Sequence, residues 1–283
     1  MAKRFHSHLR AMLRANHHRA NVPVTAERVH AAAAAEILRP DEAKMTTAQQ
    51  KAFVHAVQSL LSSGVYATLV ADHRNMKHDM HSGMDAAGTQ RFLPWHRIFL
   101  VEFEAALRAV DATVTVPYWD WAANPRFPAW LDEVRPTVEL AADDGGPHET
   151  IHVTRHPGSQ TEMPNQGLPT PQNVDAMMAA KHFTDFTRPQ TKNGALVSPF
   201  GLEGIHNTVH EWVGGTMDDV QHSPSDPVFW LHHANIDRLW AQWQTKHDGE
   251  HPALEGNKLV MDPWTNYTEV DTRTTAGLGY RYS

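Results

Sequence analysis

The 283-residue sequence contains no cysteine. This absence excludes disulfide bonds and thiolate metal ligands. Long apolar runs are also missing, so no segment has the length of a membrane span. Basic residues are not in excess, because 25 Lys and Arg stand against 32 Asp and Glu, a formal net charge of −7. We therefore expect neither a membrane nor a nucleic acid as a partner.

Histidine is the residue type present in unusual number, with 21 copies beside nine tryptophans. His206 and His210 are four residues apart, a spacing that places both imidazoles on one face of a helix. His232 and His233 follow on a second apolar, Trp-rich segment of helical length. If the two helices pack together, three imidazoles can meet at one point. Such a trio predicts a site for copper, zinc or iron.

A second histidine set lies upstream. His96 recurs at helical spacing with apolar residues in a helix that we expect to follow Pro94. His73 shares a similar stripe with Tyr66, and His78 and His81 lie in a Gly- and Met-rich segment, 75–90, that we expect to be a loop. Two inward-facing sets in one domain suggest two metals that share a pocket, since buried histidines need partners.

Four motifs carry a family resemblance. They are FLPWHR (Phe92–Arg97), VPYWDW (Val116–Trp121), HNTVHEWVGG (His206–Gly215) and DPVFWLHHANIDRLW (Asp226–Trp240). In this order they resemble the tyrosinases, the type 3 copper oxidases of phenols, and are most similar to the short bacterial members. The resemblance implies two copper ions, O2 as co-substrate and a mainly α fold, with a four-helix bundle holding a dicopper centre among long loops and a few short strands. Residues 1–40 would be an N-terminal extension and 41–283 the catalytic domain.

The resemblance also implies the copper ligands. For the first copper these are His73, His96 and a middle histidine, whose usual position nine residues before His96 is here Ala87. The nearest candidate is His81, with His78 as its competitor. In plant and fungal relatives a Cys–His thioether fixes one ligand, and this chain cannot form that link.

For the second copper the resemblance implies His206, His210 and a histidine from the next helix. Helical periodicity does not decide between His232 and His233. The resemblance selects His233 and leaves His232 beside the site. Asp237, further along the same segment, would orient a ligand histidine or pair with Arg238 or Arg74.

Other positions resemble the substrate machinery of the family. Glu203 and Asn207 match a carboxylate–amide pair that holds a basic water, which would help a phenol lose its proton, a step that costs roughly 4 kcal/mol at pH 7. Alternatively, Glu203 is a charge favoured at a helix N-terminus. Glu211, Asp218 and Val220 would line the pocket mouth, where negative charge favours cationic or neutral phenols.

The expected activity is oxidation of o-diphenols to o-quinones by O2, with ortho-hydroxylation of monophenols. The alternatives are an o-aminophenol oxidase or a catechol oxidase without monophenol activity, and, in another class, an O2-binding or copper-storage protein. A small phenol is the expected partner, together with a copper-loading helper protein. Because the N-terminus lacks an export signal, we expect a cytoplasmic location, or export with that partner.

The segment 122–200 shows no periodicity and predicts long surface loops with a small hairpin. It contains His148, His152 and His156, which are a rival metal site only if they lie on a helix. Their Thr- and Val-rich surroundings favour a strand, on which residues four apart lie ~13 Å from each other. Tyr280 and Tyr282 resemble the tyrosine motif that ends the family's catalytic domain, and we expect no C-terminal lid domain.

Overall fold

The computed structural model describes residues 36–81, 86–158, 167–188, 191–192, 195–196 and 201–283. Internal contacts divide the chain into two units, Met1–Ile37 and Leu38–Ser283. Nearly all of the first unit lies outside the described residues, including the histidines near the N-terminus. The fold described below is that of the second unit.

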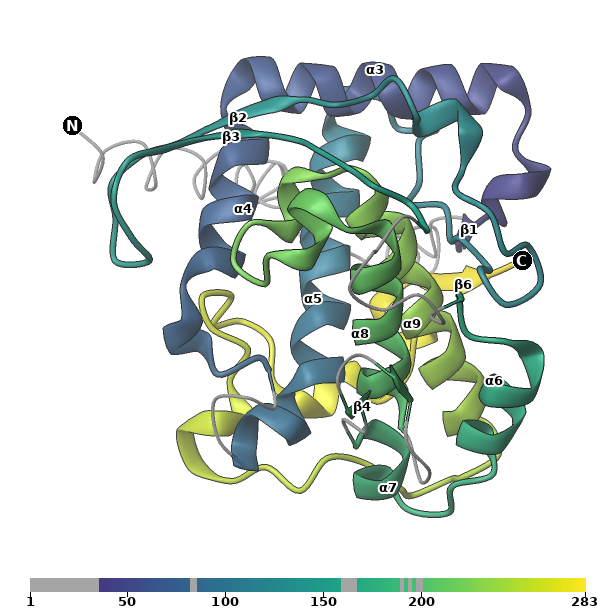
Figure 1. The fold of residues 1–283 in the computed structure, drawn as a ribbon. Coiled ribbons are helices and arrows are strands. Elements are labelled where there is room, and N and C mark those ends of the chain that lie inside the picture. Colours follow the sequence, from purple (N-terminus) through teal and green to yellow (C-terminus); the bar gives the residue numbers. More distant parts are fainter. Residues whose placement is uncertain (1–35, 82–85, 159–166, 189–190, 193–194, 197–200) are drawn as a thin grey trace, which may run out of the picture. The chain divides into compact units, whose positions relative to one another are not determined.

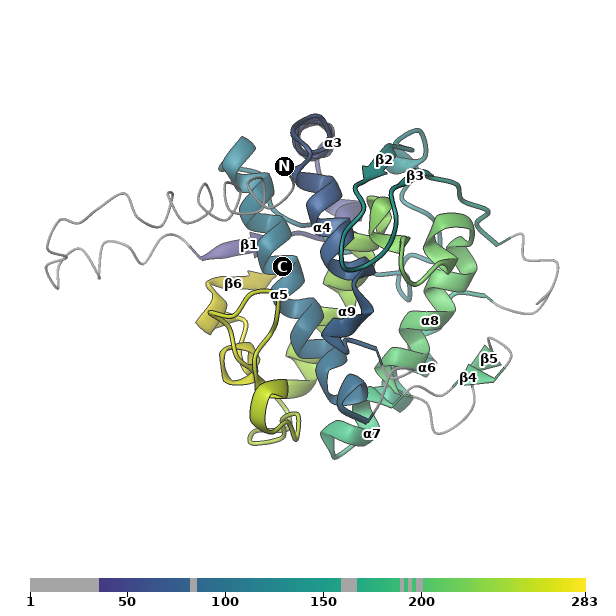
Figure 2. The same ribbon diagram turned by 90° about the vertical axis from the view of Figure 1, so that its left-hand side faces the viewer.

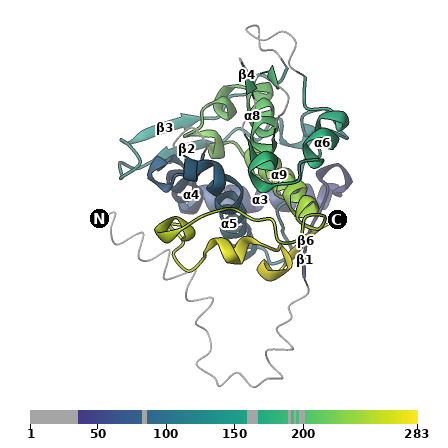
Figure 3. The same cartoon turned by 90° about the horizontal axis from the view of Figure 1, so that it is seen from below.

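The second unit is mainly α-helical, as predicted. Its helices are α3 (Thr47–Ser63), α4 (Val65–Arg74), α5 (Ala86–Val110), α6 (Pro171–Met178), α7 (Phe183–Thr187), α8 (Leu202–Val213) and α9 (Val228–Gln244). Four of them, α4, α5, α8 and α9, lie side by side as a bundle (Figures 1 and 2). The C-terminal segment lies on the α5 side of this bundle, away from α8 (Figure 3).

In the described part of the chain the strands are short and form three two-stranded sheets. They pair β1 (Ile37–Arg39) with β6 (Tyr280–Tyr282), β2 (Thr137–Leu140) with β3 (Glu149–His152), and β4 (Thr191–Lys192) with β5 (Ala195–Leu196). The antiparallel β2–β3 pair confirms the predicted hairpin. His152 lies in β3, opposite Thr137, and its Nδ1 is 3.0 Å from the Thr137 hydroxyl.

Helix α3 begins and ends at signals visible in the sequence. The Thr46 hydroxyl accepts from the Gln49 N–H at 3.3 Å, and Gln49 Oε1 accepts from the Thr46 N–H at 2.8 Å, which is a capping box. Gly64, at φ 78°, ends the helix in the left-handed region that favours glycine. Helix α4 then starts at Val65 and brings His73 to its last turn.

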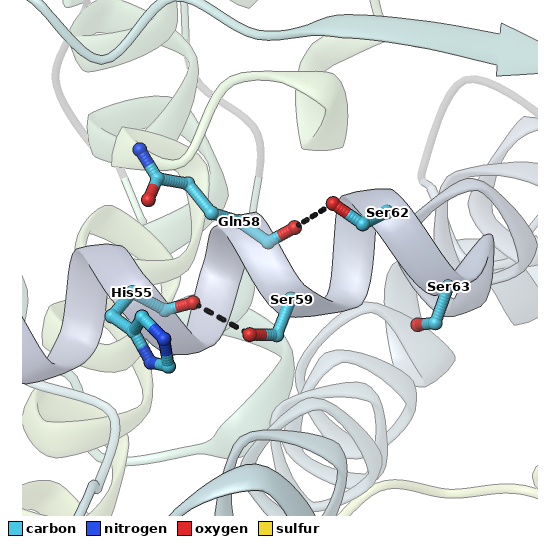
Figure 4. Close-up of a pocket in the computed structure, with 5 residues that line it drawn as sticks. All are labelled: His55, Gln58, Ser59, Ser62 and Ser63. Atoms are coloured by element: carbon cyan, nitrogen blue, oxygen red, sulfur yellow. Dashed lines mark hydrogen bonds between the residues drawn. The ribbon is translucent and has the colours of Figure 1, made fainter.

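The outer face of α3 is polar and carries a shallow depression lined by side chains of this one helix (Figure 4). The hydroxyls of Ser59 and Ser62 donate to the carbonyls of His55 and Gln58 at 3.0 and 2.9 Å. No single helix among the described residues has the length and apolar character to cross a membrane. Among the residues described, one pair of helices, α3 and α4, passes a combined test of length and apolar composition, and the chain bends by 81° between them.

Helix α5 starts earlier than predicted, at Ala86 rather than after Pro94, which lies inside it. An internal proline removes one backbone hydrogen bond and costs about 3 kcal/mol. Buried packing offsets this cost, because Phe92 and Leu93 are fully enclosed. The Arg91 guanidinium also donates to the carbonyls of His78, Lys258 and Val260, which ties this half of the helix to two loops.

Aromatic side chains fill the core between the helices. Trp230 of α9 stacks on Phe103 of α5 with ring centroids 3.8 Å apart. Its indole N–H donates to the Tyr66 hydroxyl of α4 at 2.9 Å. Three of the four bundle helices therefore meet around one tryptophan.

Asp237 of α9 joins the bundle to the C-terminal strand. It accepts from Arg97 Nε at 2.5 Å and from the hydroxyls of Tyr280 and Tyr282 at 2.6 and 2.5 Å. Burial acts to raise the pKa of Asp237, but the guanidinium groups of Arg97 and Arg39 outweigh it and hold the pKa below its ordinary value. The carboxylate is thus satisfied without a histidine.

Both predicted roles of Asp237 are therefore wrong. Its oxygens are used by arginines and tyrosines, and neither Arg238 nor Arg74 is among them. Arg238 instead donates to Asp120 at 2.7 Å, and Arg74 donates to Asp143 at 2.6 Å.

Candidate metal centre

The first histidine cluster joins α4, the loop after it and α5. His73 lies in the last turn of α4, His81 follows the 3-10 turn Met76–His78, and His96 lies in α5. The Nε2 atom of His73 is 3.4 Å from that of His81 and 3.4 Å from that of His96. His73 and His96 are buried, and His81 is partly buried.

The second cluster joins α8 and α9. His206 and His210 are one turn apart on α8, and His233 faces them from α9. The Nε2 atom of His233 is 3.1 Å from that of His206 and 3.3 Å from that of His210. The helical spacing in the sequence therefore produces the predicted convergence.

The two clusters border one space. The rings of His96 and His233 stack with centroids 4.6 Å apart, and those of His81 and His206 lie 6.4 Å apart. Phe229 stacks on His233 at 3.9 Å and closes one side of this space. Two metal ions bound at the clusters would therefore be neighbours.

Hydrogen bonds at the outer ring nitrogens fix the tautomer and the orientation of three of the imidazoles. The Nδ1–H of His96 donates to the Phe92 carbonyl at 2.7 Å, and that of His210 donates to the Met217 carbonyl at 2.6 Å. His206 donates in the same way to the Asn207 side-chain oxygen at 2.8 Å. Because a neutral imidazole carries one proton, the inward Nε2 atoms hold lone pairs.

Burial keeps these imidazoles neutral. It lowers the pKa of His81 to about 3 and that of His210 to about 4, and it lowers the pKa values of His73, His96, His206 and His233 well below the ordinary range. Converging lone pairs repel each other unless a cation lies between them. The donor set, with neutral imidazoles and no thiolate, therefore fits copper.

His78 is held outside the first cluster. Its Nδ1 lies 2.7 Å from Asp262 Oδ2, and its ring stacks on Trp95 with centroids 6.1 Å apart. The structure thus brings His81, and not its competitor His78, together with His73 and His96.

A cavity of about 220 Å³ opens onto both clusters. Its wall includes the predicted substrate residues Asn207, Glu211, Asp218 and Val220, besides His73, His81, His206 and His210. Burial, and then the nearby Asp218 carboxylate, raise the pKa of Glu211 above its ordinary value. Two carboxyl groups, those of Glu211 and Asp218, thus line the cavity.

Glu203 is buried in the first turn of α8 and is not part of the cavity wall. It lies four residues before Asn207, so the two side chains project from the same face of the helix. This position is compatible with both predicted roles, the water-holding pair and the helix N-terminal charge.

Several contacts at the site were not predicted from the sequence. The backbone carbonyls of Phe92 and Met217 accept hydrogen bonds from His96 and His210. Only the Phe92 contact was predictable, because Phe92 lies four residues before His96 on a helix. Phe229 packs against both clusters, with its ring 5.3 Å from His73 and 5.9 Å from His210. Its place one turn before His233 was the available signal.

Two buried clusters of neutral histidines, facing each other in a helical bundle, define the class of type 3 dicopper proteins. The sequence matches the description "Common central domain of tyrosinase" over residues 46–154 and 136–246. The chain belongs to the tyrosinase family. It is accordingly an oxidoreductase that acts on phenols, and its cofactor is a pair of copper ions.

Relatives of similar length support this membership. The tyrosinase of Streptomyces glaucescens is 33% identical over 260 residues, which cover 83% of this chain and 94% of the relative. The grixazone synthase of Streptomyces griseus is 30% identical over 298 residues, covering 83% of this chain and 95% of the relative.

Solved structures show the same fold. A polyphenol oxidase from Thermothelomyces thermophila superposes with a TM-score of 0.62 at 20% identity, covering 99% of this chain and 93% of that one. A functional unit of octopus hemocyanin gives 0.60 at 22% identity, covering 87% and 68%.

Proposed function

We propose that the protein oxidises o-diphenols to o-quinones with O2 and also hydroxylates monophenols at the ortho position. The observation that carries this proposal is the cavity that reaches both histidine clusters from the surface. When bound, the two coppers supply the electron transfer that reduces O2. Two diphenols then give up two electrons and two protons each, and one O2 becomes two water molecules.

Six histidines would hold the metals. His73, His81 and His96 would bind the first copper, and His206, His210 and His233 the second. The outer hydrogen bonds of His96, His206 and His210 keep their Nε2 atoms aimed at the ions, as hydrogen-bonded metal ligands do in other sites. Phe229, stacked on His233, limits how far that ring can turn.

The cavity wall would select the substrate, and its Asn207 together with the buried Glu203 would help to deprotonate it. Glu211 and Asp218 would favour phenols that carry a cationic or neutral side chain, and the half-exposed Val220 would pack against the substrate ring. Glu203 and Asn207 would hold a water that accepts the phenolic proton. Asn207 is suited to this role because its side chain both faces the cavity and contacts His206.

The experiment is turnover by the copper-loaded protein on tyrosine, dopa and o-aminophenol. Quinone formation from dopa, together with hydroxylation of tyrosine, is the expected result. Turnover of dopa alone would leave a catechol oxidase, and a preference for o-aminophenol would leave an aminophenol oxidase. Reversible O2 binding without any product would contradict the proposal.

The resemblance to octopus hemocyanin makes an O2-binding protein the second candidate. The open cavity argues against it, because binding O2 alone needs no wall of charged and amide groups. A copper-loading helper is a further part of the proposal. Full copper uptake by the purified chain from Cu(I) alone would show that no helper is required.

A further inference from the structure

A fourth histidine lies at the second cluster. His232 is fully buried, and its ring centroid is 5.1 Å from that of His206 and 5.0 Å from that of His210. One of its ring nitrogens lies within 4.8 Å of a ring nitrogen of each of the other three. Its burial and its place in this group make His232 a competitor of His233 for the metal, although His233 Nε2 lies closer to His206 and His210, at 3.1 and 3.3 Å.

A hydrogen bond from Trp121 distinguishes His232 from its neighbour. The indole Nε1–H donates to His232 Nδ1 at 3.2 Å. An indole N–H can only donate, so His232 Nδ1 must be the unprotonated nitrogen. The ring proton then resides on Nε2.

The consequence is that neither nitrogen of His232 has a lone pair to offer. The lone pair on Nδ1 is used by Trp121, and Nε2 carries the proton. His96, His206 and His210 show the opposite arrangement, since their Nδ1 atoms donate and their Nε2 atoms are unprotonated.

Backbone contacts keep Trp121 in place. It is fully buried, and its own N–H donates to the Trp119 carbonyl at 3.0 Å. The Trp119 N–H in turn donates to the carbonyl of Leu231, the residue before His232, at 3.0 Å. The segment that carries the indole is therefore tied to α9 beside the histidine that it contacts.

We propose that Trp121 is a positioning residue that selects the third ligand of the second copper. It holds His232 in the tautomer that cannot bind a metal, so that the ion takes His233. This inference rests on the proposed copper centre, but the tautomer itself is a property of the copper-free chain and can be tested without metal.

The first test is NMR of the copper-free protein with nitrogen-15 in its histidine and tryptophan side chains. We expect a scalar coupling across the hydrogen bond from the Trp121 indole to His232 Nδ1, with the proton of His232 on Nε2. A proton on Nδ1, or no coupling, would overturn the inference whether or not the loaded enzyme is active.

The second test is copper analysis of the variants His233→Gln and Trp121→Phe/His233→Gln. His233→Gln alone should lose the second copper, because His232 cannot replace the missing ligand while Trp121 holds its tautomer. Loss of the indole donor should let His232 bind instead and restore two coppers per chain. A single copper in Trp121→Phe/His233→Gln would contradict the proposal.

Trp119→Phe is the matched control. Trp119 is equally buried in the same segment, but its indole donates to the Asn124 carbonyl at 3.4 Å. Its ring contacts are with Phe127 and Trp212, and not with any histidine that the structure describes. In the His233→Gln background, Trp119→Phe should not restore the second copper. If Trp121→Phe does not fold, the NMR measurement on the wild-type chain still decides. If the wild-type chain binds one copper or none, the proposed function fails, whereas the NMR test of the His232 tautomer is unaffected.

Discussion

At the scale of single residues, the two histidines that compete for the first copper give opposite expectations. His81 converges with His73, whereas His78 faces Asp262. His81→Ala should lose the first copper and lower diphenol turnover by more than about 100-fold. Mutating a residue that only supports a metal ligand already lowers metal affinity or activity by about 10- to 100-fold. His78→Ala is the control and should keep two coppers, at a cost of about 1 kcal/mol in unfolding free energy. Copper analysis of both variants checks this, and the reverse pattern would refute the ligand set.

Glu203→Gln tests the proposed water-holding pair. The monophenol rate should fall by about 100-fold, the scale of general-base catalysis, while diphenol turnover stays near that of the wild type. A role as helix charge predicts a loss of stability instead, with both rates changed alike. Glu42→Gln serves as the control, because Glu42 is a buried carboxylate bonded to Trp130, outside the cavity wall. Steady-state rates on tyrosine and dopa separate the two outcomes.

The carboxyl groups of Glu211 and Asp218 in the cavity wall predict a charge preference among substrates. One charge near the substrate is worth about 1 kcal/mol in water, so Asp218→Asn should lower kcat/KM for tyramine by about fivefold. The rate on a phenol with a carboxylated side chain should rise. Asp144→Asn removes an exposed carboxylate that does not line the cavity and should change neither rate. Equal effects of Asp218→Asn on both substrates would show that the Asp218 charge does not discriminate between cationic and carboxylated phenols.

The spacing of histidines predicted which imidazoles come together, but it could not predict their tautomers. These depend on carbonyls such as that of Met217, which reaches His210 only after the chain turns back from α8. Asp237 shows the same limit. Its arginine and tyrosine partners lie far away in sequence, and Arg39 and Tyr282 enclose it only in the folded chain.

At the scale of elements, the network around Asp237 joins α5, α9 and the C-terminal strand. Asp237→Asn would leave Arg97 without its buried partner and should lower the free energy of unfolding by about 3–5 kcal/mol. Asp120→Asn breaks the half-buried pair with Arg238 and should cost no more than about 1 kcal/mol. Urea denaturation of the two variants provides the comparison. A similar, small loss in both would mean that the network does not hold the elements together.

Element boundaries were predictable where local chemistry sets them. The Thr46–Gln49 box and Gly64 define α3 in the sequence as they do in the structure. Pro94 misled the prediction because tertiary packing outweighed its local cost. Helix α6 was missed within the segment expected to be loop, although Thr170, Pro171 and Asn173 form a capping signal at its start. A signal of this kind is weak when no apolar stripe follows it.

At the scale of the whole molecule, the buried imidazoles make the copper-free protein sensitive to acid. The pKa values of His81 and His210 in the folded chain are about 3 and about 4, below the ordinary value of about 6.5. Below that ordinary value the unfolded chain takes up protons that the folded chain refuses, so stability falls as the pH drops from about 6.5 towards about 4. Thermal unfolding of copper-free protein across this range should show the decline.

Bound copper should change how the stability of the protein depends on pH. A metal that binds only the folded chain stabilises it, and protons compete for the same nitrogens, so the gain in melting temperature should shrink as the pH falls. A copper-free protein whose stability is flat between pH 7 and pH 4 would contradict the neutral, buried state of these histidines.

The fold class was predictable because the same apolar stripes that bury the helices also turn the histidines inward. The central claim is that two copper ions lie side by side between these clusters. X-ray absorption of the copper-loaded protein, combined with copper analysis, tests it most directly. We predict two coppers per chain, each with three imidazoles and with a neighbouring copper in its scattering. A single isolated copper, or copper with oxygen ligands only, would contradict the account.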